Sequence, residues 1–320
     1  MRATARAHPN IALIKYWGKR DTALNLPAAG SISITLSALS TDMTIELCED
    51  LDADRLTLNG EAAPQLLPRL CRCVDSVLGS DRPSVRITSS SDFPVAAGLA
   101  SSASAFAACV VAADALDDRR RSPATLANLA GRASGSAARS LYGGFAELEN
   151  AASSVRVRPL RTPAEWPLEV VVAITSEASK AVGSGAAMEL SRKTSPFYAQ
   201  WLDEQEADLA VARRAIAARD FAALGEVAEH NCLKMHSVMW STRPPMVYWT
   251  SATISCMETI RDLRQSGLPV FFTIDAGPQV KAVCAAGATD RVEAALQSTP
   301  GVLRTLRTPL GEGARVVEVA

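Results

Sequence analysis

The sequence PVAAGLASSASAFAACVVAADAL, from Pro94 to Leu116, is the most informative segment of the chain. Its first part, Pro94 to Ser104, is a loop of small residues, and the remainder is apolar enough for a buried helix. Backbone N–H groups and hydroxyls at such a junction can converge on an anion at the positive end of the helix. That is the geometry of a phosphate cradle. The same small residues also suit tight packing at a helix start, so this segment alone leaves both interpretations open.

The segments around this loop predict strands before it and mainly helices after it. Thr41 to Cys48 alternates in the β manner, and Pro83 to Thr88 does so more weakly. Ser122 and Pro123 supply an N-cap and a first-turn proline, which predicts a helix to about Ala133.

The second half of the chain is richer in helical patterns. Strands are predicted at Leu168 to Thr175 and Pro269 to Ile274, and helices at Asp203 to Arg219, Phe221 to Trp240 and about Val247 to Gln265. The composition changes near Thr175 to Gly185. This change predicts two domains, residues 1–180 and 181–320.

The composition excludes several classes of protein. The chain has 320 residues with 33 basic and 34 acidic side chains, so it lacks the basic footprint of a protein that binds nucleic acid or anionic lipid. The longest fully apolar run, Ala105 to Ala113, is about half of the roughly 20 residues that a membrane span needs. No apolar stretch long enough for a secretory signal precedes Lys15. These features predict a cytoplasmic protein.

The cysteines and histidines predict no metal centre. The seven cysteines lack the spacing of a disulfide framework, and only Cys71 and Cys73 lie close in sequence. The chain has three histidines, and the gap between His230 and His236 puts them on different helix faces. We therefore expect free thiols and no metal ligands among these side chains.

Three further segments carry side chains that could take part in catalysis or binding. Asp275 ends the apolar strand FFTIDAGP, where an unpaired carboxylate is costly, so it needs a cationic partner. The alternative is an ordinary turn. The cluster Lys15 to Lys19 follows a predicted strand, and its alternative is a solvated turn with a snorkelling lysine. Arg139 lies in a second loop of small residues, which can approach an anion or serve helix packing.

Taken together, these groups are more informative than each is alone. Lys15, Lys19, Arg139, two loops of serine and glycine, and a strand-end aspartate are the groups that phosphoryl transfer to an alcohol requires. Their joint presence favours that chemistry over the structural alternatives.

Five segments also carry a resemblance. They are NIALIKYWGKRD (Asn10 to Asp21), LNLP (Leu24 to Pro27), FPVAAGLASSASAFAA (Phe93 to Ala108), SGSAARSLYGGFAELE (Ser134 to Glu149) and FTIDAGPQV (Phe272 to Val280). In their order along the chain and in their residues, they resemble the diphosphomevalonate decarboxylase family. That family belongs to the superfamily of galactokinase, homoserine kinase, mevalonate kinase and phosphomevalonate kinase. The resemblance runs from about Ala7 to the C-terminus, and KYWGK with DAGP is more specific than the phosphate loop, which all these kinases share.

The resemblance implies an α+β, two-domain small-molecule kinase fold with a cleft between the domains. It implies ATP-dependent decarboxylation of mevalonate 5-diphosphate to isopentenyl diphosphate, in the mevalonate pathway of isoprenoid biosynthesis, by a homodimer. The alternatives are a decarboxylase of mevalonate 5-phosphate and a superfamily kinase that phosphorylates without decarboxylating. A third alternative is a binding protein that keeps the fold without activity, since a fold alone does not establish a function.

The resemblance also implies roles for individual residues. Asp275 is the implied base near the C3 hydroxyl, Lys15 its hydrogen-bonding cation and Arg139 the clamp on the substrate carboxylate. The implied substrate-binding residues are Tyr16, Trp17, Gly18, Lys19, Ser134, Gly135, Ser136, Ala137, Ala138 and Arg139. The implied ATP-binding residues are Gly98, Leu99, Ala100, Ser101, Ser102, Ser104 and Ser184. Mg²⁺ is expected beside ATP, because the transferred phosphoryl group carries charge that these few cations cannot neutralise alone.

The chain departs from the family pattern at two places. The loop that usually reads GSGSA is Ala133-Ser134-Gly135-Ser136-Ala137 here, a change that removes no hydrogen-bonding group. At Gly185 some bacterial members carry an arginine that helps to bind the diphosphate. This chain therefore holds that charge in another way or acts on a substrate with a different phosphorylation state.

Overall fold

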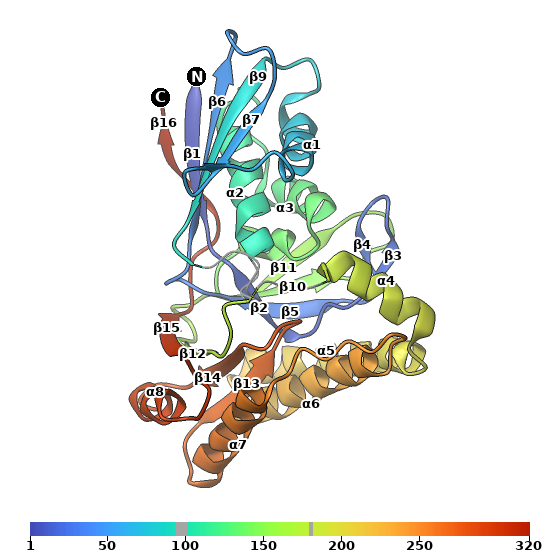
Figure 1. Cartoon of the computed structure of the whole chain (residues 1–320), viewed down its shortest axis with the longest axis vertical. Coiled ribbons are helices and arrows are strands. Elements are labelled where there is room, and N and C mark those ends of the chain that lie inside the picture. The colour runs from blue at the N-terminus through green and yellow to red at the C-terminus, as the bar shows by residue number, and fades with distance from the viewer. Residues whose placement is uncertain (94–100, 179–181) are drawn as a thin grey trace.

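The computed structural model of the chain describes residues 1–93, 101–178 and 182–320. Its strands form a six-stranded sheet, two four-stranded sheets and a two-stranded ribbon, with helices against the three larger sheets. Figure 1 shows the first sheet at one end of the molecule and the helices of the second half at the other. Within the described ranges the strand pairs are antiparallel except that of β7 with β9. The predicted α+β class is confirmed.

The first sheet contains both ends of the chain. Its order is β16 (Arg315–Val319), β1 (Arg2–Ala7), β6 (Thr41–Cys48), β9 (Ser84–Ser91), β7 (Arg55–Leu58) and β8 (Glu61–Ala62). The last strand pairs antiparallel with the first, so the two termini lie side by side (Figure 1). The alternation predicted for Thr41 to Cys48 is confirmed, because buried and partly exposed residues alternate along most of β6.

Helix α2 (Ser101–Ala115) lies against the inner face of this sheet and is buried along almost its whole length. Its small side chains allow α1 (Leu67–Leu78), α3 (Pro123–Ala133) and strands β1 and β6 to approach it closely. The Ser122 side chain accepts a hydrogen bond from the Thr125 N–H. The helix predicted from Pro123 to Ala133 is therefore confirmed at both ends.

The middle sheet connects the two halves of the molecule. Its order is β11 (Arg156–Arg161), β10 (Phe145–Glu149), β5 (Ser31–Thr35) and β2 (Asn10–Ile14), and the ribbon of β3 (Lys19–Asp21) and β4 (Leu26–Pro27) follows β2. Both β2 and β5 are fully buried. The 3₁₀ helix η1 (Ala137–Leu141) packs against this sheet, as do α5 (Tyr198–Ala218) and α6 (Phe221–Trp240).

The helices of the second half pack on the two faces of the third sheet. Its order is β13 (Val270–Ile274), β14 (Val280–Cys284), β12 (Glu169–Ile174) and β15 (Arg304–Pro309). One face packs with the middle sheet, α5 and α6, and the other packs under α7 (Ser251–Gln265) and α8 (Thr289–Gln297). Helix α4 (Ser184–Thr194) lies beside α5 and α6.

The elements predicted for the second half are confirmed with two shifted helix starts. Helix α5 begins at Tyr198, earlier than the predicted Asp203. Both predicted strands form, as β12 and β13, and the first two predicted helices form as α5 and α6. The prediction of a helix start at about Val247 was wrong, because the Thr250 and Thr253 side chains form a capping box that begins α7 at Ser251. Strand β12 pairs in the third sheet and β16 returns to the first. The division at residue 180 stays a prediction.

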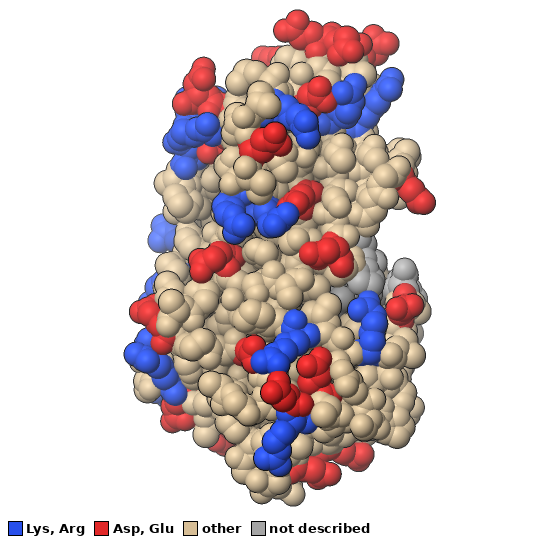
Figure 2. All heavy atoms as spheres, turned by 90° about the vertical axis from the view of Figure 1, so that its left-hand side faces the viewer, with Lys and Arg blue, Asp and Glu red and all other residues tan. Residues whose placement is uncertain are grey.

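The surface carries mixed charge. On the face that Figure 2 shows, basic and acidic side chains lie next to one another over most of the surface, and acidic side chains gather along its upper end. This distribution agrees with the net charge of −1. None of the helices in the described part of the chain combines the length and the apolar character that a membrane crossing requires.

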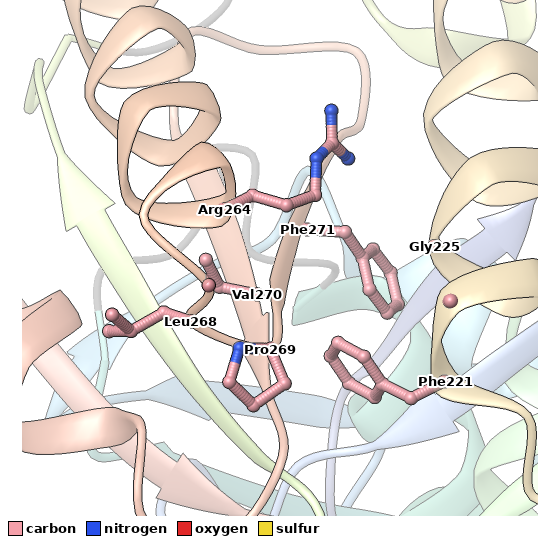
Figure 3. A pocket seen from close by; sticks show the side chains of 9 residues that line it. Phe221, Gly225, Arg264, Leu268, Pro269, Val270 and Phe271 are labelled. Atoms are coloured by element: carbon pink, nitrogen blue, oxygen red, sulfur yellow. The ribbon is translucent and has the colours of Figure 1, made fainter.

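Gly225 of α6 allows β13 to pack directly against the helix. A Cβ atom at this position would lie 2.9 Å from Phe271 Cδ1 and 3.0 Å from Phe271 Cβ. Figure 3 shows the rings of Phe221 and Phe271 beside Gly225, at the edge of a cavity of about 300 Å³. The two ring centroids are 5.1 Å apart.

We expect Gly225→Ala to lower the free energy of unfolding by up to about 2 kcal/mol, measured by urea denaturation, because buried Phe271 must shift at a cost of about 1–3 kcal/mol. This loss outweighs the gain of about 1 kcal/mol in helix propensity. The matched control is Gly185→Ala in the first turn of α4, where nothing lies within 4 Å of the added carbon. The control should be neutral or slightly stabilising, and an equal loss in both variants would contradict this account.

Candidate functional site

The centre of the site is a carboxylate held between two lysines. Lys15 directly follows β2, is 1% exposed, and donates from Nζ to Asp275 Oδ1 and to the Ala12 carbonyl, each at 2.8 Å. Lys281 of β14 is fully buried, and its Nζ lies 3.4 Å from Asp275 Oδ2. The Asp275 side chain itself remains 24% exposed. The two ammonium groups therefore approach the carboxylate from inside the protein.

These charges determine the protonation state of Asp275. Burial of the carboxyl group would by itself raise its pKa, but the positive charges of Lys15 and Lys281 and the hydrogen bond from Lys15 outweigh burial and hold the pKa well below its usual range. Asp275 is therefore ionised at neutral pH. Its Oδ2 atom is buried and accepts no hydrogen bond of good geometry within the described ranges, although the Lys281 ammonium is near.

Long-range contacts bring this group together. Asp275 follows β13, and the Gly277 N–H donates to its carbonyl at 2.7 Å in the turn toward β14. The Thr273 hydroxyl donates to the Ala12 carbonyl at 3.0 Å, which ties β13 to β2. The Ala12 carbonyl thus accepts from both Thr273 and Lys15.

The backbone of Lys15 is held on both sides by two buried amide side chains. Its N–H donates to Asn231 Oδ1 of α6, and its carbonyl accepts from Gln205 Nε2 of α5, each at 2.7 Å. Asn231 Nδ2 in turn donates to Gln205 Oε1 at 2.8 Å. Sequence reasoning missed both residues, because nothing in the local helical pattern distinguishes them from ordinary polar positions.

Arg139 of η1 is a buried cation with neutral partners. Its Nε donates to Ser33 Oγ at 2.8 Å, another guanidinium nitrogen donates to Ser31 Oγ, and Asn10 Oδ1 accepts at 3.2 and 3.3 Å. Burial lowers the pKa of Arg139 to about 10, and the charges of Tyr16 and Asp275 oppose this shift. No carboxylate of the described ranges lies within ion-pair distance of the guanidinium. An anionic ligand would supply the missing charge.

Of the two aromatic residues after Lys15, Tyr16 packs against the second small-residue loop and Trp17 against helix α4. The Tyr16 hydroxyl lies against Gly135, so that a side chain at Gly135 would overlap it. Burial raises the pKa of Tyr16 to about 12, against the opposing effect of Arg139. Trp17 is 3% exposed and donates from its indole nitrogen to Ser191 Oγ of α4 at 2.9 Å. Gly18 has a φ of +123°, a conformation that glycine adopts without strain.

In the second small-residue loop, the serines are partly exposed and the alanines are buried. Ser134 and Ser136 are partly exposed with hydroxyls 3.4 Å apart, whereas Ala137 and Ala138 are fully buried in the core under the first sheet. Asn10 Nδ2 donates to the Ser136 carbonyl at 2.9 Å. This bond connects the loop to β2, next to Arg139.

Lys19 and Arg69 form a second cluster of positive charge. Burial and the charge of Arg69 lower the pKa of Lys19, while burial and the charge of Arg72 lower that of Arg69. The Arg69 guanidinium stacks 4.8 Å from the centroid of the Phe106 ring and donates to the Ala133 carbonyl at 3.2 Å. Sequence reasoning missed Arg69, which lies in an ordinary amphipathic helix. Mutually repelling cations of this kind favour an anion between them.

A cavity of about 190 Å³ opens beside the start of α2. It is lined by Met43, Leu56, Leu58, Leu66, Arg69, Leu70, Ser89, Ser91, Ser101, Ser102, Ala105 and Phe106. The structure thus brings the predicted Ser101 and Ser102 to an apolar cavity with a cation at its wall. Gly98, Leu99 and Ala100, also predicted to contact ATP, lie outside the described residues.

The remaining predicted residues lie apart from this cavity. Ser104 is fully buried, and its hydroxyl bonds to Thr41 Oγ1 at 2.7 Å and to the Ser101 carbonyl at 3.1 Å. Ser184 is the half-buried first residue of α4, and Gly185 after it is exposed. Among the residues that the structure describes, no cluster of three or more His, Cys, Asp or Glu side chains could hold a metal ion.

We expect Lys15→Met to lower the free energy of unfolding at pH 7 by about 3 kcal/mol, because it removes one partner of a buried ion pair. The stabilisation due to the lowered pKa of Asp275 is fully present above its unfolded-state pKa of about 3.9 and is lost as the pH falls through the folded-state value. The difference between wild type and variant should therefore shrink in acid. Urea denaturation between pH 3 and pH 7 measures it.

The control for this prediction is Lys193→Met. Lys193 is 62% exposed and pairs with Glu189 at 3.2 Å. A surface pair of this kind is worth about 0–1 kcal/mol. A loss as large as that of Lys15→Met would show that the method does not report the buried pair.

The chain is similar to known proteins over most of its length. Residues 7–156 match the diphosphomevalonate decarboxylase-like N-terminal domain, and residues 170–305 match the mevalonate 5-diphosphate decarboxylase C-terminal domain. Among curated relatives, the diphosphomevalonate decarboxylase of Candida albicans is 33% identical over 300 residues, covering 86% of this chain and 82% of the relative. The Homo sapiens enzyme is 33% identical over 302 residues, covering 86% and 74%.

Solved structures of related enzymes are similar over nearly the whole chain. The mevalonate diphosphate decarboxylase of Staphylococcus aureus has a TM-score of 0.93 and 36% identity, covering 99% of this chain and 98% of that one. A structure described as MDDEF in complex with MVAPP, AMPPCP and magnesium has a TM-score of 0.91 and 32% identity, covering 100% and 99%. Similarity at this level confirms the predicted two-domain kinase fold.

Proposed function

The chain belongs to the diphosphomevalonate decarboxylase family, and on this premise we propose that it catalyses the ATP-dependent decarboxylation of mevalonate 5-diphosphate. The products are isopentenyl diphosphate, ADP, phosphate and carbon dioxide. The observation that carries the proposal is the ionised Asp275, held 2.8 Å from Lys15 and within electrostatic reach of the buried Arg139. A base beside a cation without a countercharge suits a substrate that has both a hydroxyl and a carboxylate.

In this proposal Asp275 is the general base. Its carboxylate takes the proton of the C3 hydroxyl while the hydroxyl oxygen attacks the γ-phosphorus of ATP, and the bond to ADP breaks. General-base assistance is typically worth roughly 10²–10⁴ in rate. Lys15 fixes Oδ1 and opposes the desolvation that would otherwise protonate the base.

Phosphorylation makes the tertiary hydroxyl a good leaving group. The C3–O bond then breaks with its electron pair on phosphate, and positive charge develops at C3. Next, the bond from the neighbouring carbon to the carboxylate breaks. Its electron pair forms the double bond, and carbon dioxide leaves.

Arg139 is the proposed clamp for the carboxylate. The planar guanidinium can pair bidentately and stays charged at any working pH. Ser31, Ser33 and Asn10 fix its orientation before the substrate arrives. Tyr16, Trp17, Gly18, Lys19 and residues Ser134 to Ala138 are proposed to complete the substrate site, and Lys19 supplies positive charge for the diphosphate.

ATP is proposed to bind at the start of α2. The apolar cavity of about 190 Å³ suits a nucleotide base, and Ser101, Ser102 and the N-terminus of α2 suit the phosphates. Arg69 lies at this cavity and next to Lys19, so that it faces both anionic ligands. Gly98, Leu99, Ala100, Ser104 and Ser184 remain part of the proposed ATP site by family resemblance.

Mg²⁺ is the proposed companion of ATP. Magnesium is commonly held by one or two protein oxygens together with substrate phosphates and water, so it does not need a cluster of acidic side chains. The hydroxyls of Ser101 and Ser102, at the cavity beside the start of α2, are the oxygen donors that fit it. When bound, the ion neutralises charge on the transferred phosphoryl group.

The same proposal includes a homodimer in the cytoplasm and a division into domains 1–180 and 181–320. Family resemblance supports the dimer, and the change of composition near Thr175 to Gly185 supports the boundary. Cross-linking and limited proteolysis would test these parts independently of activity.

The experiment that tests the function incubates purified protein with ATP, Mg²⁺ and, separately, mevalonate, its 5-phosphate and its 5-diphosphate. We expect equal release of ADP and carbon dioxide with the 5-diphosphate. Asp275→Asn should lower that rate by roughly 10²–10⁴ while the protein stays folded. Release of both products only from the 5-phosphate would identify the neighbouring decarboxylase, and ADP without carbon dioxide would identify a kinase.

A second prediction concerns ATP. We expect Arg69→Met to raise KM for ATP roughly tenfold or more, since a charge-assisted hydrogen bond contributes about 1.5–3 kcal/mol. The matched control is Arg72→Met, one helical turn along α1, which is exposed and does not line the cavity. Steady-state kinetics with varied ATP measures both, and equal KM values in the two variants would remove Arg69 from the ATP site.

A further inference from the structure

Lys281 occupies an unusual place for a charged residue. It lies in the middle of β14, whose five residues are all buried, between β13 and β12. Its cross-strand neighbours are Thr273 of β13 and Val172 of β12. A lysine in such a position is strongly destabilising unless its charge is compensated.

The charge that compensates Lys281 is that of Asp275. Lys281 Nζ lies 3.4 Å from Oδ2, while Lys15 Nζ lies 2.8 Å from Oδ1, so each carboxylate oxygen faces its own ammonium group. Two cations attached to different sheets thus restrain one side chain. Lys15 comes from the end of the middle sheet and Lys281 from the third sheet.

We propose that Lys281 is a positioning residue for the reaction, which acts through Asp275 by keeping the carboxylate ionised and fixing its orientation toward the substrate hydroxyl. This inference rests on the proposed function, in which Asp275 is the base. Lys15 alone cannot fix the plane of the carboxylate, because a single contact to Oδ1 leaves rotation about that contact. The second contact at Oδ2 restricts that rotation.

The electrostatic surroundings of Asp275 come from four elements of the described structure. The groups that face it are Lys15 after β2, Lys281 of β14, Arg139 of η1, and His236 and Cys232 of α6. Burial lowers the pKa of His236 to about 3 and raises that of Cys232, so both are neutral at working pH. A change in the protonation of Asp275 on removing Lys281 is therefore not masked by either residue.

The test compares the pH dependence of kcat/KM for mevalonate 5-diphosphate in the wild-type protein and in Lys281→Met. Methionine keeps the length of the side chain and removes its charge, so Asp275 becomes protonated at a higher pH. Loss of one nearby cation typically raises a carboxyl pKa by about 1–3 units. We therefore expect the ratio of variant to wild-type kcat/KM to fall by about twofold or more between about pH 8 and about pH 4.5. Titration of the substrate phosphates cancels in this ratio.

Two further variants separate charge from packing. Lys281→Arg keeps a cation and should restore a ratio that does not change with pH. Val283→Ala, two residues along β14 and fully buried on the same face, removes packing without altering charge. The ratio of its kcat/KM to that of the wild type should also stay constant with pH, even though its stability is lower. A flat ratio for Lys281→Met in a protein that turns over the substrate would overturn the proposal.

Thermal unfolding of Asp275→Asn, Lys281→Met and the double variant gives a readout that needs no turnover. If Lys281 acts on Asp275, Lys281→Met should lower the melting temperature less in the Asp275→Asn protein than in the wild type. Equal decreases in the two backgrounds would overturn the proposal. Absence of carbon dioxide release by the wild-type protein would instead reject the proposed function, and the unfolding comparison would still decide whether the two residues are coupled.

Discussion

The structure depends on the pairing of the buried Lys15 ammonium with the carboxylate of Asp275, 260 residues further along the chain. A lysine that is 1% exposed is tolerated only where an opposite charge meets it. The end of β2 must therefore meet the turn after β13, which brings the middle sheet against the third. The Ala12 carbonyl, Asn231 and Gln205 complete the junction with hydrogen bonds.

Around this pair the described residues hold an excess of positive charge. One carboxylate is surrounded by Lys15, Lys281 and Arg139. A second cluster of positive charge consists of Lys19 and Arg69. Such an arrangement is less stable alone than with an anion bound. A ligand with several negative charges would therefore stabilise the folded chain as it binds, because it interacts with the native state only.

Much of this could be predicted from local sequence. Small residues and a long apolar run predicted the buried α2, and Ser122 with Pro123 predicted the start of α3. Lys15, Arg139 and Asp275 were singled out by residue type and position in the local pattern, and the family resemblance added their individual roles. Lys281 was missed, since one lysine in an apolar strand carries no local signal of its partner. Gln205, Asn231 and Arg69 were missed for the same reason: their partners lie far away in sequence.

The pairing of β16 with β1 has a consequence for how the chain folds as it is synthesised. Strand β1 is synthesised long before its neighbour on one side, β16 (Arg315–Val319). Until β16 is synthesised, β1 has β6 on one side and an open edge on the other. A nascent chain therefore carries an unpaired strand edge while the residues between β1 and β16 are synthesised, at about 5–20 residues per second. Folding of the first sheet is completed only after β16 has emerged from the ribosome and paired with β1.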